Sequence, residues 1–308
     1  MESGDMTTDG RVKQKMSTSA KGTVFMLISA LCYGVSPALV KIQFDFGLNS
    51  SSVLMYRSGF AVLIIFGIML FQKKPVTVSR FDRKRLFIVG FFCALSLTVL
   101  VESYAFIDVG LASALHYTFP MFVNVLSALV FRQILTGSRL LSLLLGLSGV
   151  FVLAFNTSQK GAAFGIFLAV LSGFLFGVYM LVLERLPFEN RNALLVTMYL
   201  NLAIALYTLL YNIAFARLRP ISSLPSGLHL ILLAVINGVL ALLFFRSGVL
   251  LLGASRASIV ATIEPLFSVM FGVLIVGEPL TTMLLIGLVL ILVGLLIGNL
   301  SRATRKTG

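Results

Sequence analysis

Long runs of apolar residues, each separated from the next by a short polar segment, extend along most of the chain. A transmembrane helix needs about 20 predominantly apolar residues to cross the hydrocarbon core of a bilayer, and most of the runs approach or exceed this length. We therefore predict an all-α integral membrane protein with ten transmembrane helices. The predicted helices cover residues 22–42, 51–71, 85–106, 112–131, 139–155, 161–183, 192–214, 227–252, 254–276 and 281–300.

The composition excludes a water-soluble fold. Of the 308 residues, 58% are hydrophobic and only 11% are charged, and the mean hydropathy is +1.04. Soluble domains contain about 45–50% apolar and about 25% charged residues, so this chain has too few polar side chains to cover a surface that faces water. The lipid bilayer is therefore its expected surrounding, and the polar segments 1–21 and 301–308 are predicted to be terminal tails.

The net charge is +13, which in a soluble protein would suggest nucleic-acid binding. Here Lys and Arg lie between and beside the apolar runs, where such residues set the orientation of a membrane protein. We therefore expect no nucleic-acid partner. With the N-terminus in the cytoplasm, the cytoplasmic segments hold 18 Lys and Arg residues and the exterior segments hold four. Because positive charge concentrates in cytoplasmic loops, we predict a multi-pass protein of the inner (plasma) membrane with both termini in the cytoplasm.

The two halves of the chain, 22–155 and 161–300, resemble each other. A shift of 145 residues places Ala112-Ser113 on Ala257-Ser258 and Pro120 on Pro265. Each half has five predicted helices, and because five is odd, the second half enters the membrane from the opposite side. Inverted repeats of this kind recur in secondary transporters, whose substrate site lies near the midplane between the repeats.

Three segments also carry a family resemblance. The run from Gly110 to Pro120, the run from Gly253 to Pro265 and the following Gly277-Glu-Pro-Leu resemble the EamA branch of the drug/metabolite transporter superfamily. The resemblance extends over both halves and implies a ten-helix permease that exports small metabolites, often amino acids. The chain departs from the family pattern in having no Trp and in placing Glu102 within the third predicted helix.

Two prolines, Pro120 and Pro265, lie inside predicted helices. Proline removes one backbone hydrogen bond and clashes with the carbonyl four residues earlier, which frees the carbonyls of His116 and Ala261. In a bilayer such groups must find a partner or face a water-filled cavity. We therefore expect two hinges or cavity walls at equivalent positions of the two halves. Static kinks that serve only packing are the alternative.

Polar side chains share helix faces with these prolines or occur on neighbouring predicted helices. Residues three or four apart lie on one face of a helix, and a polar face inside an apolar bundle can bind a solute that has shed its water. Helix packing is the alternative role for the same side chains. The candidate substrate-binding residues are Tyr33, Glu102, His116, Tyr117, Asn124, Tyr179, Arg246, Thr262 and Glu264.

Ionisable residues inside a membrane are costly and are candidates for function. We expect Glu264 and His116 to face a central cavity. His116 could relay a proton, since histidine titrates near neutral pH, or it could be a hydrogen-bonded structural residue. Glu102 and Arg246 are expected nearer the rim, where they pair with each other or with charges on the substrate.

Two further cations, Lys41 and Arg57, lie close to the ends of the first and second predicted helices. Long basic side chains near a helix end can bury their methylene groups and extend the charged group to the membrane interface. We expect this arrangement for both residues.

The leading functional hypothesis is a secondary transporter that exports a small metabolite, such as an amino acid, by alternating access. A nucleotide-sugar or phosphorylated-metabolite exchanger is the alternative, and a proton as coupling ion and a homodimer are both compatible with the sequence. The chain lacks a P-loop and the common hydrolase and metalloprotease motifs. We therefore expect no enzymatic activity, cofactor or metal, and regard an intramembrane enzyme or a channel as less well supported.

Overall fold

A computed structural model describes residues 18–119, 121–123, 125–126, 137–155, 161–185, 192–252, 257, 260–261 and 263–305. These residues form helices and the links between them, with no strand in the described part of the chain. The elements are α1 (Thr18–Asp45), α2 (Ser50–Phe71), α3 (Arg80–Ser103), α4 (Val109–His116), α6 (Gly137–Phe155), α7 (Ala162–Arg185), α8 (Ala193–Ala214), α9 (Leu224–Leu233), η1 (Ala234–Ala241), α10 (Leu242–Leu252), α12 (Glu264–Phe271), η2 (Gly272–Val276) and α13 (Thr282–Arg305).

Ten apolar helical segments coincide with the ten predicted spans. Among the described residues, six helices are long and apolar enough to cross a membrane. Four shorter apolar helices, Val109–Val123, Leu144–Leu153, Glu264–Val276 and Thr282–Ile297, occupy the remaining predicted positions. The predicted all-helical membrane fold is therefore confirmed.

The starts of two helices differ from the prediction because polar groups cap them. α3 begins at Arg80, five residues early, since the Ser79 side chain accepts a hydrogen bond from the Asp82 amide at 3.0 Å. A serine N-cap of this kind satisfies one of the free amides of the first turn. α4 begins at Val109, three residues before its predicted start, and its first amides are bound by a carboxylate from the link between η2 and α13.

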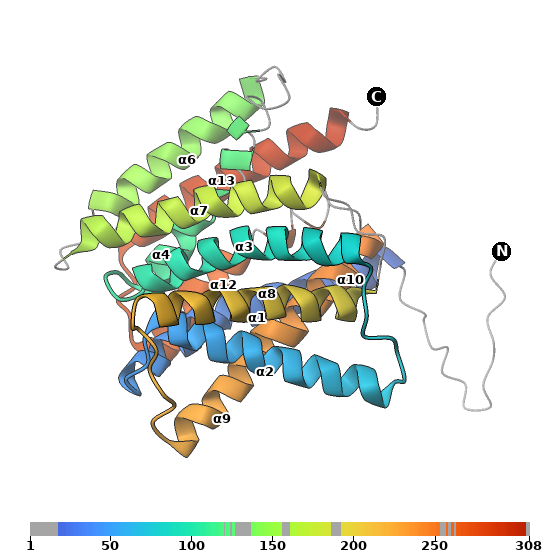
Figure 1. Cartoon of the computed structure of the whole chain (residues 1–308). Coiled ribbons are helices and arrows are strands. Elements are labelled where there is room, and N and C mark those ends of the chain that lie inside the picture. The colour runs from blue at the N-terminus through green and yellow to red at the C-terminus, as the bar shows by residue number, and fades with distance from the viewer. Residues whose placement is uncertain are drawn as a thin grey trace, which may run out of the picture.

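The helices run roughly parallel or antiparallel, as Figure 1 shows. α3 packs against both α7 and α8, and α1 packs against α10 and α12. α6 and α13 lie side by side at one edge of the bundle (Figure 1). Their backbones approach so closely at Gly149 that a Cβ atom there would lie 2.7 Å from the Gly287 carbonyl oxygen, which is the close packing that small residues allow between membrane helices.

The eighth span is one long helix, α9–η1–α10, whose middle part η1 is π-helical. Side chains of neighbouring helices bind its carbonyls. The Ser29 hydroxyl donates to Ala241 O at 2.9 Å, and the Asn201 amide donates to Gly238 O at 3.2 Å. Backbone groups in a bilayer must be satisfied within the protein, so α1 and α8 are held against this irregular segment.

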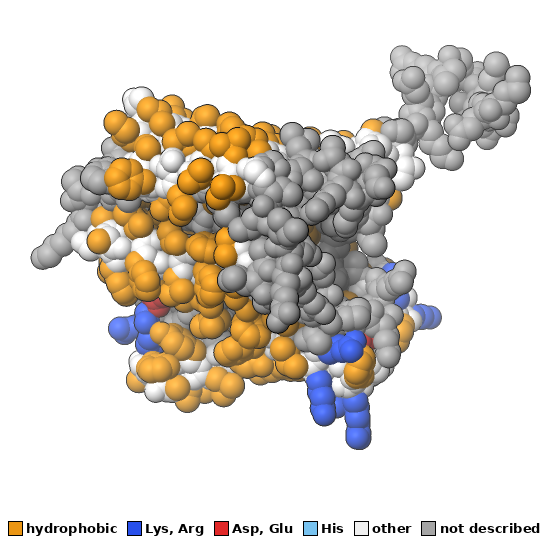
Figure 2. All heavy atoms as spheres, turned by 90° about the horizontal axis from the view of Figure 1, so that it is seen from above, with side chains coloured by type: hydrophobic (Ala, Val, Ile, Leu, Met, Phe, Trp, Pro, Cys, Tyr) orange, Lys and Arg blue, Asp and Glu red, His pale blue; other side chains and the backbone are white. Residues whose placement is uncertain are grey.

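The outer surface of the bundle is largely apolar. In Figure 2, the described part of one face is covered mainly by hydrophobic side chains, with Lys and Arg gathered toward its edges. Large exposed hydrophobic residues include Leu63, Leu147, Phe151 and Phe167, which are 57–64% exposed. A soluble protein rarely exposes such a continuous apolar surface, so the surface agrees with a location in lipid.

Candidate functional site

The centre of the site is a contact between the end of α4 and the start of α12. The Tyr117 hydroxyl lies 2.5 Å from Glu264 Oε2 and 3.2 Å from the carbonyl oxygen of Ala261. Because Pro265 has no amide hydrogen, it cannot donate to Ala261 O, four residues earlier. Tyr117 therefore supplies the partner that the sequence analysis requires for this carbonyl, and it joins the two halves of the chain.

His116, the last residue of α4, is held by α7. Its Nδ1 atom lies 2.9 Å from Ser172 Oγ, and Ser172 Oγ also donates to Ala169 O at 2.6 Å. The carbonyl of His116 lies against the backbone of Gly173, where a Cβ atom would approach it to 2.8 Å. The side chain of His116 is buried, so α7 fixes the position of both its ring and its backbone.

Aromatic rings surround this contact. The His116 ring centroid lies 5.2 Å from that of Phe176 and 6.0 Å from that of Phe119. Phe119 lies 4.7 Å from Phe176 and 5.5 Å from Tyr117, and Phe176 lies 5.0 Å from Tyr179. These five residues, His116, Tyr117, Phe119, Phe176 and Tyr179, are called the aromatic enclosure below. Their ring faces are electron-rich and can bind a cation.

α1 completes the site because a glycine allows it to approach α12 closely. A Cβ atom on Gly34 would collide with Phe267 and would lie 3.2 Å from the Glu264 carbonyl oxygen. Ser268 Oγ also donates to Gly34 O at 3.2 Å. The adjacent Tyr33 thereby comes within electrostatic range of Glu264 and Tyr179. Tyr33 and Glu264 lie inside the bundle yet keep partly accessible surfaces.

The structure thus brings together five of the nine candidate residues, namely Tyr33, His116, Tyr117, Tyr179 and Glu264. Phe119 and Phe176 belong to the same group, although only their spacing from His116 and Tyr179 along the helices could have indicated them. Asn124, Thr262 and the hinge candidate Pro120 lie outside the described residues. The side chain of Arg246, in α10, also lies outside the described part.

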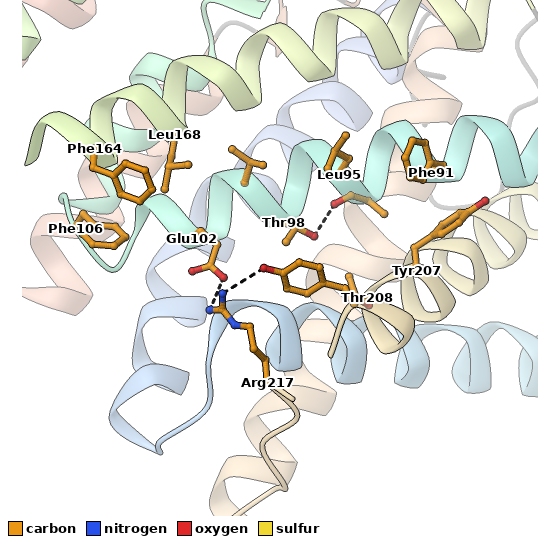
Figure 3. A pocket seen from close by; sticks show the side chains of 13 residues that line it. Phe91, Leu95, Thr98, Glu102, Phe106, Phe164, Leu168, Tyr207, Thr208 and Arg217 are labelled. Carbon is orange, nitrogen blue, oxygen red and sulfur yellow. Dashed lines mark hydrogen bonds and ion pairs between the residues drawn. The ribbon is translucent and has the colours of Figure 1, made fainter. Parts of the chain in front are cut away.

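Glu102 lies apart from the aromatic enclosure and Glu264. It faces a groove between α3, α7 and α8 with a volume of about 530 Å³, shown in Figure 3. Its partner is Arg217, whose Nη2 atom lies 2.6 Å from Glu102 Oε1, and Arg217 also donates to the Tyr211 hydroxyl at 3.3 Å. Glu102 therefore pairs with Arg217 in the α8–α9 link, which sequence spacing could not indicate. Its expected pairing with Arg246, whose side chain lies outside the described part, stays a prediction.

Lys41, near the end of α1, binds carboxylates, which its position in the sequence does not indicate. Its Nζ atom lies 3.1 Å from Glu278 Oε1 and 3.9 Å from Asp108 Oδ1. Glu278 also accepts hydrogen bonds from the amides of Val109 at 2.7 Å and Gly110 at 3.2 Å. A carboxylate at a helix N-terminus is favourable because it meets free amides and the positive end of the helix dipole. The position of Glu278 in the segment Gly277-Glu-Pro-Leu does not by itself indicate this role.

Arg57 is also placed differently from the expectation. The residue is only 5% exposed and faces the interior of the bundle, not the interface. No group of three or more His, Cys, Asp or Glu residues in the described part of the chain is arranged to hold a metal ion.

Comparison with known proteins identifies the family. The EamA-like transporter family matches residues 20–155 and 163–300. An uncharacterized transporter of Archaeoglobus fulgidus is 29% identical over 279 residues, covering 90% of this chain and 95% of that protein. The uncharacterized transporter YcbK of Bacillus subtilis is 25% identical over 295 residues, covering 89% of this chain and 91% of that protein.

A crystal structure of another protein shows the same fold. It superposes with a TM-score of 0.60 at 17% identity and covers 91% of this chain and 96% of that one. The two matched segments correspond to the two halves of the helical bundle, and the matched relatives are named as transporters. The chain therefore belongs to the EamA-like transporter family of the drug/metabolite transporter superfamily, whose members are membrane proteins built from two repeats.

Proposed function

We propose that the protein exports a small amphipathic metabolite that carries an ammonium group, an amino acid or a related compound. The observation that carries this proposal is the Glu264 carboxylate beside the aromatic enclosure. A carboxylate binds an ammonium group through charge-assisted hydrogen bonds, and aromatic faces attract the same cation while they pack against an apolar side chain. Glu264, Tyr117 and the rings of Phe119 and Phe176 would therefore bind the two ends of such a molecule.

The depth of these residues supports a site in the middle of the membrane. Twelve residues separate Glu264 from the end of η2 at Val276, and twelve separate Tyr33 from the end of α1 at Asp45. At a rise of about 1.5 Å per residue, each lies about 18 Å from the end of its helix. Half of the hydrocarbon core is about 15 Å thick, so both side chains lie near the depth where transporters with inverted repeats bind substrate.

Alternating access would move segment 22–155 relative to segment 161–300. Two ion pairs connect these segments on one side of the bundle, Lys41 with Glu278 and Glu102 with Arg217. Asn49 and Ser51 of the first segment also bind Arg217 O and Asn212 of the second, at 2.5 and 2.7 Å. The charge distribution predicts that this side is exterior, so the described arrangement corresponds to a state closed toward the exterior.

Proton coupling would follow from the same carboxylate. Glu264 can bind either a proton or a substrate ammonium group, and binding one releases the other. An inward flow of protons would then drive the substrate outward. This exchange needs no group beyond Glu264 and Tyr117.

The test is transport in proteoliposomes with labelled amino acids, amines, sugars and phosphorylated metabolites, with and without a pH gradient. We expect transport of an amino acid or amine that depends on the gradient. Glu264→Gln keeps the shape of the side chain and should abolish this dependence, whereas Asp45→Asn, at an exposed position at the end of α1, should behave like the parent. Transport of only sugars or phosphorylated compounds would support the alternative exchanger, and a fully active Glu264→Gln variant would refute the proposal.

A further inference from the structure

A second charged group lies inside the bundle, separate from Glu264. Arg57 follows the start of α2 by seven residues, which places it about 10 Å along the helix axis. The residue is 5% exposed, and its Nε atom is buried without a hydrogen-bond partner. Lys41 pairs with Glu278 and Asp108, and Arg217 pairs with Glu102, so these carboxylates have other partners than Arg57.

The groups that face Arg57 are neutral. Its electrostatic neighbours are Tyr33 of α1, Cys93 of α3 and Tyr104 at the end of α3. An arginine side chain stays protonated in a protein, and an uncompensated charge inside a membrane is costly, so such residues usually face a substrate or an ion. A purely structural arginine would be expected to bind carbonyls or a carboxylate, and none binds Arg57 in the described part of the chain.

Tyr33 connects this arginine with the candidate site. It lies within electrostatic range of both Arg57 and Glu264. A positive group and a negative group thus both lie within electrostatic range of one partly accessible tyrosine in the interior of the bundle. An amino acid carries the complementary pair of charges, one ammonium group and one carboxylate group.

We propose that Arg57 binds the carboxylate of the transported molecule while Glu264 binds its ammonium group. The proposal rests on the proposed function and specifies the substrate class as a zwitterionic amino acid. A guanidinium group can bind a carboxylate through two parallel hydrogen bonds. Arg57 would therefore distinguish an amino acid from an amine that has the same side chain.

The number of available cations favours a carboxylate over a phosphate group. A phosphate monoester carries a charge of about −1.5 to −2 at neutral pH and is commonly bound by more than one cation. In the described helices and links near this end of α2, Lys41 and Arg217 already have carboxylate partners. Among the described residues near this end of α2, Arg57 is the buried guanidinium group with no carboxylate partner, whereas Arg219 is exposed in the α8–α9 link. One buried guanidinium group matches the single charge of a carboxylate.

The experiment compares phenylalanine with phenylalaninamide, which keeps the ammonium group and the shape but has no carboxylate charge. Binding to purified protein is measured by thermal shift, and transport is measured in proteoliposomes. We expect the parent to prefer phenylalanine by about 10- to 100-fold, the range for a hydrogen bond between charged groups. Arg57→Gln should remove this preference by weakening phenylalanine alone, and Arg57→Lys should retain part of it, because lysine keeps the charge without the planar fork.

Arg80→Gln is the matched control, because Arg80 is exposed at the start of α3, and it should keep the preference of the parent. The melting temperature of Arg57→Gln should not fall, since the change removes an unpaired charge from the interior. If Arg57→Gln still prefers phenylalanine, or if Arg57→Gln unfolds while Arg57→Lys shows no change in preference, Arg57 is structural and this assignment is wrong.

The outcomes also separate this assignment from the proposed function. If the parent binds both compounds equally and still depends on Glu264, the proposed function holds and the carboxylate site is refuted. If phosphoethanolamine binds better than phenylalanine in an Arg57-dependent manner, the ligand group is a phosphate and the carboxylate assignment is wrong. If the parent neither binds nor transports any amine or amino acid, the proposed function fails and this assignment fails with it.

Discussion

The hydroxyl of Tyr117 lies 2.5 Å from Glu264 Oε2 and joins the first half of the chain to the second at the interior of the bundle. The same hydroxyl lies 3.2 Å from the carbonyl of Ala261, to which Pro265 cannot donate. The single hydroxyl hydrogen of Tyr117 is therefore shared between the candidate ligand carboxylate, at the shorter distance, and a backbone carbonyl just before α12. This double role makes Tyr117 the most sensitive position in the site for a conservative substitution.

We predict that Tyr117→Phe lowers transport about tenfold or more while the protein still folds. The change removes a hydrogen bond to a carboxylate, which is worth about 1.5–3 kcal/mol, and a loss of about 1.4 kcal/mol corresponds to a tenfold change. Tyr199→Phe is the matched control, because the Tyr199 hydroxyl donates to Val76 O, outside the site. The measurement is initial transport rate at equal protein content. Equal rates for both variants would contradict the assigned role of Tyr117.

Pro265→Ala should make transport slower and change the melting temperature little. Alanine supplies an amide that can bind Ala261 O, and Pro265 lies in the first turn of α12, where proline costs little stability. This bond would compete with Tyr117 for the carbonyl and stiffen the break before α12. The melting temperature and the transport rate are measured together. An unchanged transport rate would mean that the proline serves packing and not a hinge.

Gly34→Ala should destabilise the protein, because the added methyl group would collide with Phe267 where α1 meets α12. Overpacking of this kind typically costs about 1–3 kcal/mol, and the shift of α1 would move Tyr33 away from Glu264. Gly59→Ala is the control, since a Cβ atom at Gly59 would have no atom within 4 Å. The melting temperature should fall for Gly34→Ala only, and a fall of equal size in both variants would show a general intolerance of substitution.

Lys41 and Glu278 should be energetically coupled, because their charges lie 3.1 Å apart and the Glu278 side chain is 6% exposed. We expect a double-mutant cycle of Lys41→Met and Glu278→Gln to give a coupling of about 0.5–3 kcal/mol. A cycle of Glu278→Gln with Lys84→Met, at an exposed position of α3, should be additive. Additive effects in the first cycle as well would show that the ion pair does not hold this side of the bundle closed.

The predicted orientation can be tested directly with reporter fusions. Fusions after residues 75, 135, 190 and 305 should report a cytoplasmic location, and a fusion after residue 158 should report the exterior. The physical reason is the excess of Lys and Arg in the cytoplasmic segments. An exterior signal after residue 75 would reverse the assignment, and the side closed by Lys41 and Glu278 would then be cytoplasmic.

The sequence by itself determined the fold class and the helices that build the candidate site. The thickness of the bilayer sets the length that an apolar run needs to cross it. The ten segments could therefore be predicted without knowledge of any contact between helices. The two prolines also follow from backbone chemistry alone, because a missing amide frees a carbonyl in any surroundings. For this reason, the environment of Tyr117 and Glu264 could be expected in outline from the sequence.

Only the tertiary structure decided which charges pair and which remain alone. Lys41 and Arg57 have similar positions near helix ends in the sequence, yet Lys41 binds Glu278, whereas Arg57 is buried with no carboxylate partner among the residues that the structure describes. Glu102 finds its partner in the α8–α9 link, more than 100 residues away. The helical period predicts the face of the helix on which a side chain lies. Which residue of another helix or link contacts that face depends on how the helices pack and how the links fold. Pairing between distant charges therefore emerges only when the whole bundle is assembled.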